Sequence, residues 1–68
     1  MKQIGTIIKT RRRMMGLTLR DVVNSTGLPF TVLGAIESNV NNPTPSQIKL
    51  IAYALGMFPS DLDEEPTE

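Results

Sequence analysis

Residues 19–36 read LRDVVNSTGLPFTVLGAI, and this stretch decides the fold of the 68-residue chain. Short runs of apolar residues at helical spacing lie on either side of Gly27. Glycine commonly ends a helix because it adopts the left-handed backbone conformation without a steric penalty. Thr18 stands where it can cap the helix before Gly27, and Pro29 stands where a first-turn proline would start the helix after it. The stretch therefore predicts two short helices joined by a tight turn.

The sequence on both sides of this stretch also predicts helices, and no strand pattern is convincing. Gly16 ends a first helix, and Gly56 stops a fourth helix that runs to about Leu55. Residues 44–47 (TPSQ) form a capping box with proline at the first helical position, and Pro59 opens a last short turn. The apolar positions that recur close to the helical period are Ile4, Ile8, Met15, Val22, Val23, Leu33, Ile36, Ile48, Ile51, Ala52 and Leu55.

These helices predict an all-α protein, a compact five-helix bundle in one domain over residues 1–62, with an acidic flexible tail at residues 63–68. The chain contains no cysteine and no histidine, which excludes disulfides and argues against a structural zinc site. No apolar run reaches the roughly 18 residues of a membrane span, and the amino terminus lacks the apolar core of a signal peptide. We therefore expect a cytoplasmic protein with no cofactor, no metal and no membrane association.

The formal net charge is zero, yet the charges are separated along the sequence. Basic residues gather in the first twenty positions, and acidic residues gather in the last eight. The basic end could attract phosphate groups, and the alternative is that both ends are simply solvated. The basic residues are Lys2, Lys9, Arg11, Arg12, Arg13 and Arg20, and the acidic residues are Asp61, Asp63, Glu64, Glu65 and Glu68.

One ion pair can be predicted from the apolar pattern. Arg12 falls on the inward stripe of the first helix, and a lone buried charge is very costly. Glu37 is the only acidic residue between positions 22 and 60, and it adjoins Leu33 and Ile36 on the inner side of the third helix. We expect a partly buried pair between Arg12 and Glu37 that ties these two helices together. The alternative is that they are two unrelated surface charges.

Several features in one register give the sequence a family resemblance. Residues 19–36 fit a twenty-residue helix-turn-helix window, and the chain resembles the Cro/repressor-like helix-turn-helix family of the XRE type. This family has the five-helix, lambda repressor-like domain of phage repressors and many bacterial regulators, and the resemblance covers about residues 4–62. The matching positions are Val22, Gly27, Leu28, Leu33 and Ile36 in the window, followed by residues 36–37 (IE), 42–44 (NPT) and 52–56 (AYALG).

The resemblance implies a transcriptional regulator, in the first place a repressor, whose third helix (about residues 29–38) enters the major groove of double-stranded DNA. It also implies a homodimer that reads two half-sites, and it matches Arg12 and Glu37 to a structural salt bridge. Leu19 falls where many relatives carry a glutamine that touches phosphate. The implied base-reading residues are Phe30, Thr31, Gly34 and Ala35, and the implied contacts to the DNA backbone are Arg11, Arg13, Leu19, Arg20, Ser38, Asn39, Asn41 and Asn42.

Self-association is expected at the carboxyl-terminal end, where similar proteins dimerise. The alternative is that Phe58 and Leu62 only close a small core. The residues expected at the dimer interface are Leu50, Tyr53, Met57, Phe58 and Leu62.

The third helix departs from the family in one respect that opens a second interpretation. It carries no Arg, Lys, Asn or Gln, the side chains that usually recognise guanine and adenine. The alternative function is therefore a protein-interaction module, such as an antagonist, a co-regulator or an antitoxin-like partner, with weak or no specific DNA binding. We do not expect an enzyme, because histidine and cysteine are absent and the carboxylates gather in the tail.

Overall fold

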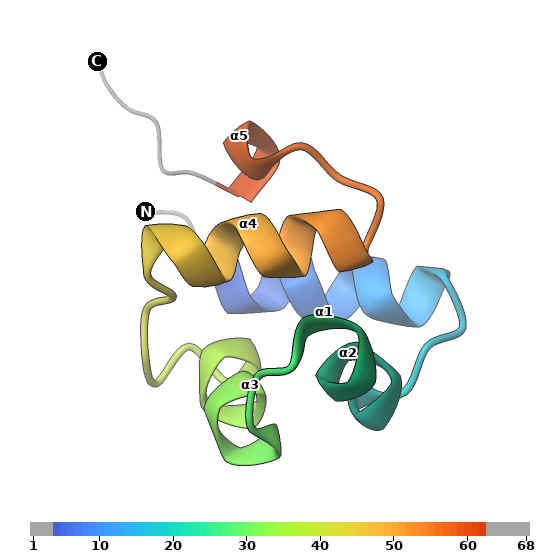
Figure 1. Cartoon of the computed structure of the whole chain (residues 1–68), viewed down its shortest axis with the longest axis horizontal. Helices are drawn as coiled ribbons and strands as arrows, with labels where there is room; N and C mark the ends of the chain where they lie inside the picture. The colour runs from blue at the N-terminus through green and yellow to red at the C-terminus, as the bar shows by residue number, and fades with distance from the viewer. Residues whose placement is uncertain (1–3, 63–68) are drawn as a thin grey trace.

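Five α-helices follow one another along residues 4–62, the part of the chain that the structure, a computed structural model, describes. No strand occurs in this part of the chain (Figure 1). The predicted all-α class with five helices is therefore confirmed, whereas the tail expected at residues 63–68 lies outside the described residues. The helices are α1 (Ile4–Met14), α2 (Leu19–Thr26), α3 (Phe30–Glu37), α4 (Pro45–Ala54) and α5 (Pro59–Leu62).

Side-chain caps fix the first residues of α2 and α4, as the sequence predicts. Thr18 Oγ1 accepts a hydrogen bond from the Asp21 N–H at 3.1 Å, and Asp21 Oδ2 accepts one from the Thr18 N–H at 2.8 Å. Thr44 and Gln47 exchange the same two bonds at the start of α4, at 3.2 and 2.9 Å. Each capping box satisfies two backbone donors of the helix start. Gly27 ends α2 with a φ of 76°, in the left-handed region.

The start of α3 differs from the starts of α2 and α4. Pro29 precedes the helix as its N-cap residue, with φ −60° and ψ 146°. The sequence predicts this proline in the first turn of the helix, and that prediction is wrong. The side chain of this N-cap residue makes no hydrogen bond to the helix, because proline has no polar side-chain atom. The first backbone N–H groups of α3 are therefore not satisfied by a cap, in contrast to those of α2 and α4.

The helices enclose one aliphatic core. The pair α2 and α3 lies on one side of α4, and α5 lies on the opposite side (Figure 1). Contacts join α3 to α1 and α2, α4 to α2 and α5, and α5 to α1. None of the described helices is long and apolar enough to cross a membrane. The buried apolar residues are Ile8, Val22, Leu33, Ile36, Ile48, Ile51, Ala52, Leu55 and Leu62.

Two expectations from the sequence are wrong. Leu62 was expected at a dimer interface, but its side chain has 0% exposure and belongs to the core, because α5 folds back onto α4 and α1. Met15 was expected on the inward stripe of the first helix, but it follows the last residue of α1 and is 43% exposed. The helical period no longer applies once the chain turns at Gly16, which has a φ of 72°.

The first turn of α1 is fastened to the end of α3. A Cβ atom added to Gly5 would overlap the carbonyl oxygen of Ile36, so only glycine allows the two backbones to approach in this way. Asn39, which has a left-handed φ of 62°, accepts a hydrogen bond from the Gly5 N–H through Oδ1 at 3.0 Å. Its Nδ2 donates to Thr6 Oγ1, also at 3.0 Å. Asn39 thus caps α1 from 34 positions further along the chain.

Candidate functional site

The four residues implied as base readers share one side of α3, which we call the outer face of α3 (Phe30, Thr31, Gly34 and Ala35). Phe30 is 54% exposed, Thr31 is exposed, and the other two are half-buried. Their common side follows from helical spacing, since positions three and four apart lie on the same face. The opposite side of α3 is buried and consists of Leu33, Ile36 and Glu37.

The outer face of α3 offers few polar groups. Thr31 supplies its only side-chain hydroxyl, and Phe30 supplies an aromatic ring. Gly34 leaves the backbone bare, and the nearest side-chain atom to a Cβ added there is Leu19 Cδ2, at 4.0 Å. Leu19, at the start of α2, therefore borders this face with apolar surface and gives phosphate no side-chain donor. Such a face suits apolar contacts and close backbone approach more than paired hydrogen bonds.

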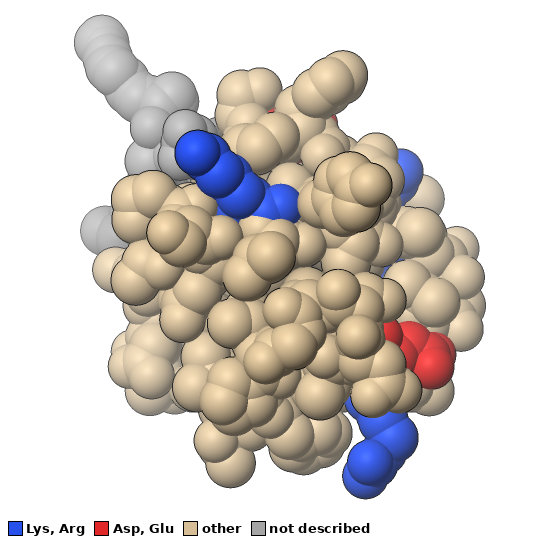
Figure 2. Space-filling view, viewed as in Figure 1, with Lys and Arg blue, Asp and Glu red and all other residues tan. Residues whose placement is uncertain are grey.

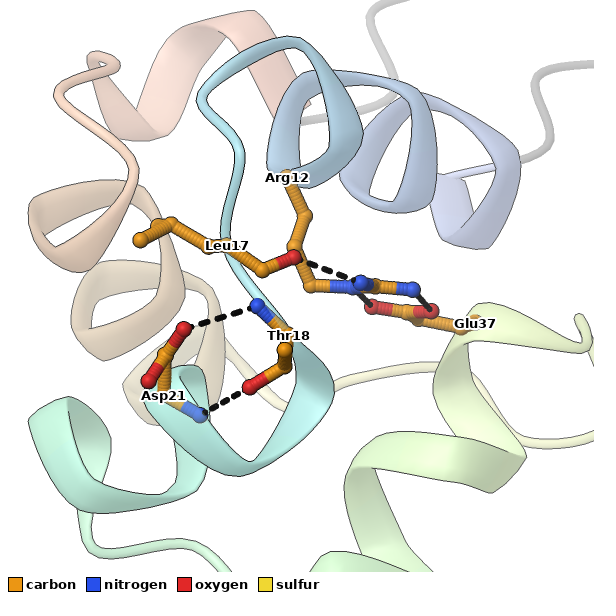
Figure 3. A network of polar contacts seen from close by, with 5 residues as sticks. All are labelled: Arg12, Leu17, Thr18, Asp21 and Glu37. Carbon is orange, nitrogen blue, oxygen red and sulfur yellow. Dashed lines mark hydrogen bonds and ion pairs between the residues drawn. The ribbon is translucent and has the colours of Figure 1, made fainter.

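The expected ion pair between Arg12 and Glu37 is present, and it has two hydrogen bonds (Figure 3). Arg12 Nε donates to Glu37 Oε2 at 2.7 Å, and Arg12 Nη2 donates to Glu37 Oε1 at 3.0 Å. The side chains are only 12% and 7% exposed, and hydrogen bonding to the carboxylate raises the pKa of Arg12. Arg12 Nη1 also donates to the carbonyl oxygen of Leu17 at 2.8 Å, a contact that the sequence did not predict. One guanidinium thus joins α1, the turn before α2, and α3.

Several residues implied as phosphate contacts are exposed. Arg13 at the end of α1 and Arg20 in the first turn of α2 are both exposed and carry the positive charges nearest to the α2 start in sequence. The loop between α3 and α4 adds hydroxyl and amide groups at its surface. Its exposed members among the implied contacts are Ser38, Asn39, Asn41 and Asn42.

Two of the implied phosphate contacts make hydrogen bonds that join parts of the fold. Arg11 is half-buried, and its Nε donates to the carbonyl oxygen of Leu55 at 3.1 Å, so it fastens α1 to the end of α4. Asn39 uses both ends of its amide group to cap α1. The sequence missed these roles because each joins residues more than thirty positions apart. A signal was present at Asn39, since asparagine tolerates the left-handed conformation at a helix end.

The residues expected at the dimer interface divide into two groups. Tyr53, Phe58 and Leu50 are exposed, to 90%, 74% and 44%, and Met57 is half-buried. Leu62 is excluded, because it lies in the core. Figure 2 shows few charged side chains on this face, with a basic one over the region of α4, where Lys49 is exposed. The exposed side chains of Tyr53, Phe58 and Leu50 offer apolar surface that a partner could cover.

The capping box of α2 makes a prediction about acid stability. The bonds to Thr18 lower the pKa of Asp21 below its ordinary value of 3.8. Because the folded chain binds the proton less tightly, the contribution of Asp21 is complete above pH 3.8 and is lost as the pH falls through the lower folded value. We expect Asp21→Asn to flatten the pH dependence of the thermal midpoint in this acid range.

Thr18→Ala is the matched control for that experiment. It removes the side-chain part of the box and is expected to lower stability by about 1 kcal/mol near neutral pH. The Thr18 backbone N–H, the larger cause of the lowered Asp21 pKa, remains, so part of the acid dependence should persist. A wild-type pH profile for Asp21→Asn would contradict the assignment of this dependence to the cap.

Comparisons of this chain with protein-family models, with curated proteins and with solved structures found no match. The assignment of a function therefore depends on the residues and contacts described above.

Proposed function

We propose that the chain is a sequence-specific DNA-binding repressor that acts as a homodimer, with α2 and α3 forming a helix-turn-helix unit. The observation that carries the proposal is the placement of α3. Its inner side is fixed by Leu33, Ile36 and the ion pair of Glu37, while its outer face is open to solvent. A short helix held in this way can enter the major groove without disturbing the core.

The chemistry of the outer face supports a sparse form of base readout. The Thr31 hydroxyl can bond to a base edge, and the Phe30 ring or the Ala35 methyl group can contact the methyl group of thymine. Gly34 permits close approach of the helix backbone. Because these groups distinguish few base pairs directly, sequence-dependent shape and flexibility of the DNA would supply part of the specificity.

The DNA backbone would be held by groups around this face. The first N–H groups of α3 are not satisfied by a cap, and such donors suit a phosphate oxygen. Arg13 and Arg20 would neutralise phosphates and release counterions, which favours binding at low salt. Exposed amide and hydroxyl groups of the loop after α3 would add neutral contacts.

Selection from a pool of randomised duplex DNA at moderate salt is the experiment that tests this function. We expect the purified protein to enrich an inverted repeat whose half-sites lie about one helical turn apart. Binding without enrichment at low salt would leave only a phosphate-binding protein, and no binding at all would refute the proposal.

Arg20→Ala should weaken DNA binding by a similar factor for every sequence, because a phosphate contact carries no base information. For this variant, the slope of log affinity against log salt concentration should become shallower by about 0.9. Lys49→Ala is the matched control, since Lys49 is equally a surface cation but lies on α4. Titrations at several salt concentrations measure both slopes, and equal losses for the two variants would contradict a specific role for Arg20.

A protein-interaction module is the second candidate function. The apolar side chains of Tyr53, Phe58 and Leu50 on and beside α4 favour it, because all three are exposed. The DNA selection separates the two candidates. Enrichment of an operator favours the repressor, and its absence favours a protein partner.

A further inference from the structure

A groove runs along the surface of α1, where this helix meets the turn after α4. Its volume is about 300 Å³, and its walls are almost wholly apolar. An apolar cavity of about 150 Å³ accommodates benzene, so the groove has room for a larger apolar group. We call it the α1 groove, and its lining residues are Thr6, Ile7, Thr10, Arg11, Met14 and Met57.

The floor of the α1 groove belongs to the folded core, and one end of the groove is open. Ile7 and Met57 are half-buried, and both pack against the core. Met14, the last residue of α1, is 74% exposed, so its side chain can lie over a ligand. Methionine side chains are flexible and polarisable, and they adapt to apolar ligands of different shapes. An apolar group bound here would therefore cover methionine surface that now faces water.

Arg11 is the charged residue of the α1 groove. It is half-buried, and its Nε donates to the Leu55 carbonyl oxygen at 3.1 Å, which holds the guanidinium beside the end of α4. Its Nη1 and Nη2 atoms make no hydrogen bond or ion pair with any other residue between positions 4 and 62. The two N–H groups at this end of a guanidinium match the two oxygens of a carboxylate.

No acidic side chain in the described part of the chain neutralises Arg11. Glu37 pairs with Arg12, and the carboxylates of Asp21 and Asp61 accept hydrogen bonds from backbone N–H groups. These are all the acidic residues between positions 4 and 62. A half-buried cation without a counter-charge, beside an apolar groove, is complementary to a ligand with one negative group and one apolar part.

We propose that the α1 groove binds a small amphipathic carboxylate, with its apolar chain against Met14 and Met57 and its two oxygens on Arg11. Small-molecule sites commonly combine apolar walls with one oriented polar group in this way. The acidic sequence after Leu62, DEEPTE, carries carboxylates but offers the apolar walls only a proline ring. The phosphate groups of DNA supply negative charge without an apolar chain. A free amphipathic acid has both properties, and its binding does not depend on the proposed function.

The methyl signals of the methionines in NMR spectra measure this binding in the full chain. Octanoate and octanol are the probes, because they share an apolar chain and only octanoate carries a carboxylate. Both are added below the concentration at which they aggregate. We expect each probe to shift the signals of Met14 and Met57, which line the groove, more than the signal of Met15, which does not.

Replacing Arg11 separates the carboxylate contact from the apolar walls. Arg11→Met should weaken octanoate binding by about tenfold, because hydrogen bonds to a charged group are lost. Octanol binding should stay within about twofold of the wild type, since the walls remain apolar. Lys9→Gln is the matched control, because Lys9 is also a cation of α1 but is exposed and does not line the groove. This variant should bind octanoate as the wild type does.

A second pair of variants is needed because Arg11→Met also removes the bond to Leu55. Thr10 lines the groove and is exposed, so Thr10→Glu and Thr10→Gln place side chains of similar size there without disturbing the core. We expect Thr10→Glu to bind octanoate about fivefold more weakly than Thr10→Gln, because like charges repel. The two variants should bind octanol equally.

Four results would each overturn the proposal. The first is an absence of methionine shifts up to the solubility limit of octanoate. The second is an equal loss of octanoate binding in Arg11→Met and Lys9→Gln, and the third is an equal loss of octanoate and octanol binding in Arg11→Met. The fourth is a set of shifts that follows protein concentration without a probe, which would place a second copy in the groove. None of these measurements uses DNA, so the DNA selection succeeds or fails independently of them.

Discussion

Replacing Glu37 with alanine is expected to lower the free energy of unfolding by about 3 kcal/mol. The reason is the guanidinium left behind: Arg12 is 12% exposed and would lose both bonds to the carboxylate, at 2.7 and 3.0 Å. Its third bond, to the Leu17 carbonyl, keeps the cation in the same place instead of releasing it to water. The loss is therefore mainly the desolvation of an unpaired charge. Unfolding in urea measures it directly.

The double variant Arg12→Met/Glu37→Met is the control for this interpretation. When both charges are removed together, no ion stays buried without a partner, and well-packed apolar replacements are often close to neutral. We expect the double variant to be more stable than Glu37→Ala. A Glu37→Ala variant within about 0.5 kcal/mol of the wild type would show that the pair is exposed in solution, because surface pairs contribute this little.

Replacing Gly5 with alanine is expected to destabilise the fold by about 2 kcal/mol, although α-helix propensity alone favours alanine by up to about 1 kcal/mol. The added methyl group would overlap the Ile36 carbonyl oxygen and lie 2.7 Å from Asn39 Oδ1. A backbone oxygen has no alternative rotamer, so α1 would have to move away from α3. That movement would also strain the Asn39 bond to the Gly5 N–H.

Gly34→Ala is the matched control, because Gly34 is also a helical glycine. The nearest side-chain atom to its added Cβ is 4.0 Å away, an ordinary contact distance. We expect this variant to gain up to about 1 kcal/mol from helix propensity. Opposite signs for the two variants in thermal unfolding would verify the close approach at Gly5, and a stabilised Gly5→Ala variant would refute it.

The sequence predicted the features of this fold that depend on near neighbours. The cap at Thr18 and the capping box at Thr44 each involve residues three positions apart, and Gly27 ends α2 where a left-handed residue is needed. The pair of Arg12 and Glu37 was also predictable, because one inward cation had only one acidic candidate in the central part of the chain. Each of these inferences required a local pattern or a single choice of partner.

The remaining features depend on how the helices pack, and a single sequence does not specify that. Leu62 was assigned to a dimer interface because similar proteins dimerise at this end, yet it fills the core, which was the alternative. Arg11 and Asn39 were assigned to DNA from their place in a family pattern, while the structure uses both to fasten α1. The implied base-reading residues do share one side of α3, but the polarity of their side chains does not identify a ligand.

The division of α3 into a fixed inner side and an open outer face has a consequence for how this protein can change. Stability depends on Leu33, Ile36 and Glu37, whereas the buried-core contacts do not include Phe30 or Thr31. Substitutions at those two positions can therefore accumulate with little penalty in folding. Under the proposed function, recognition would change there one residue at a time, and selection on binding and selection on folding would act on different residues of the same eight-residue helix.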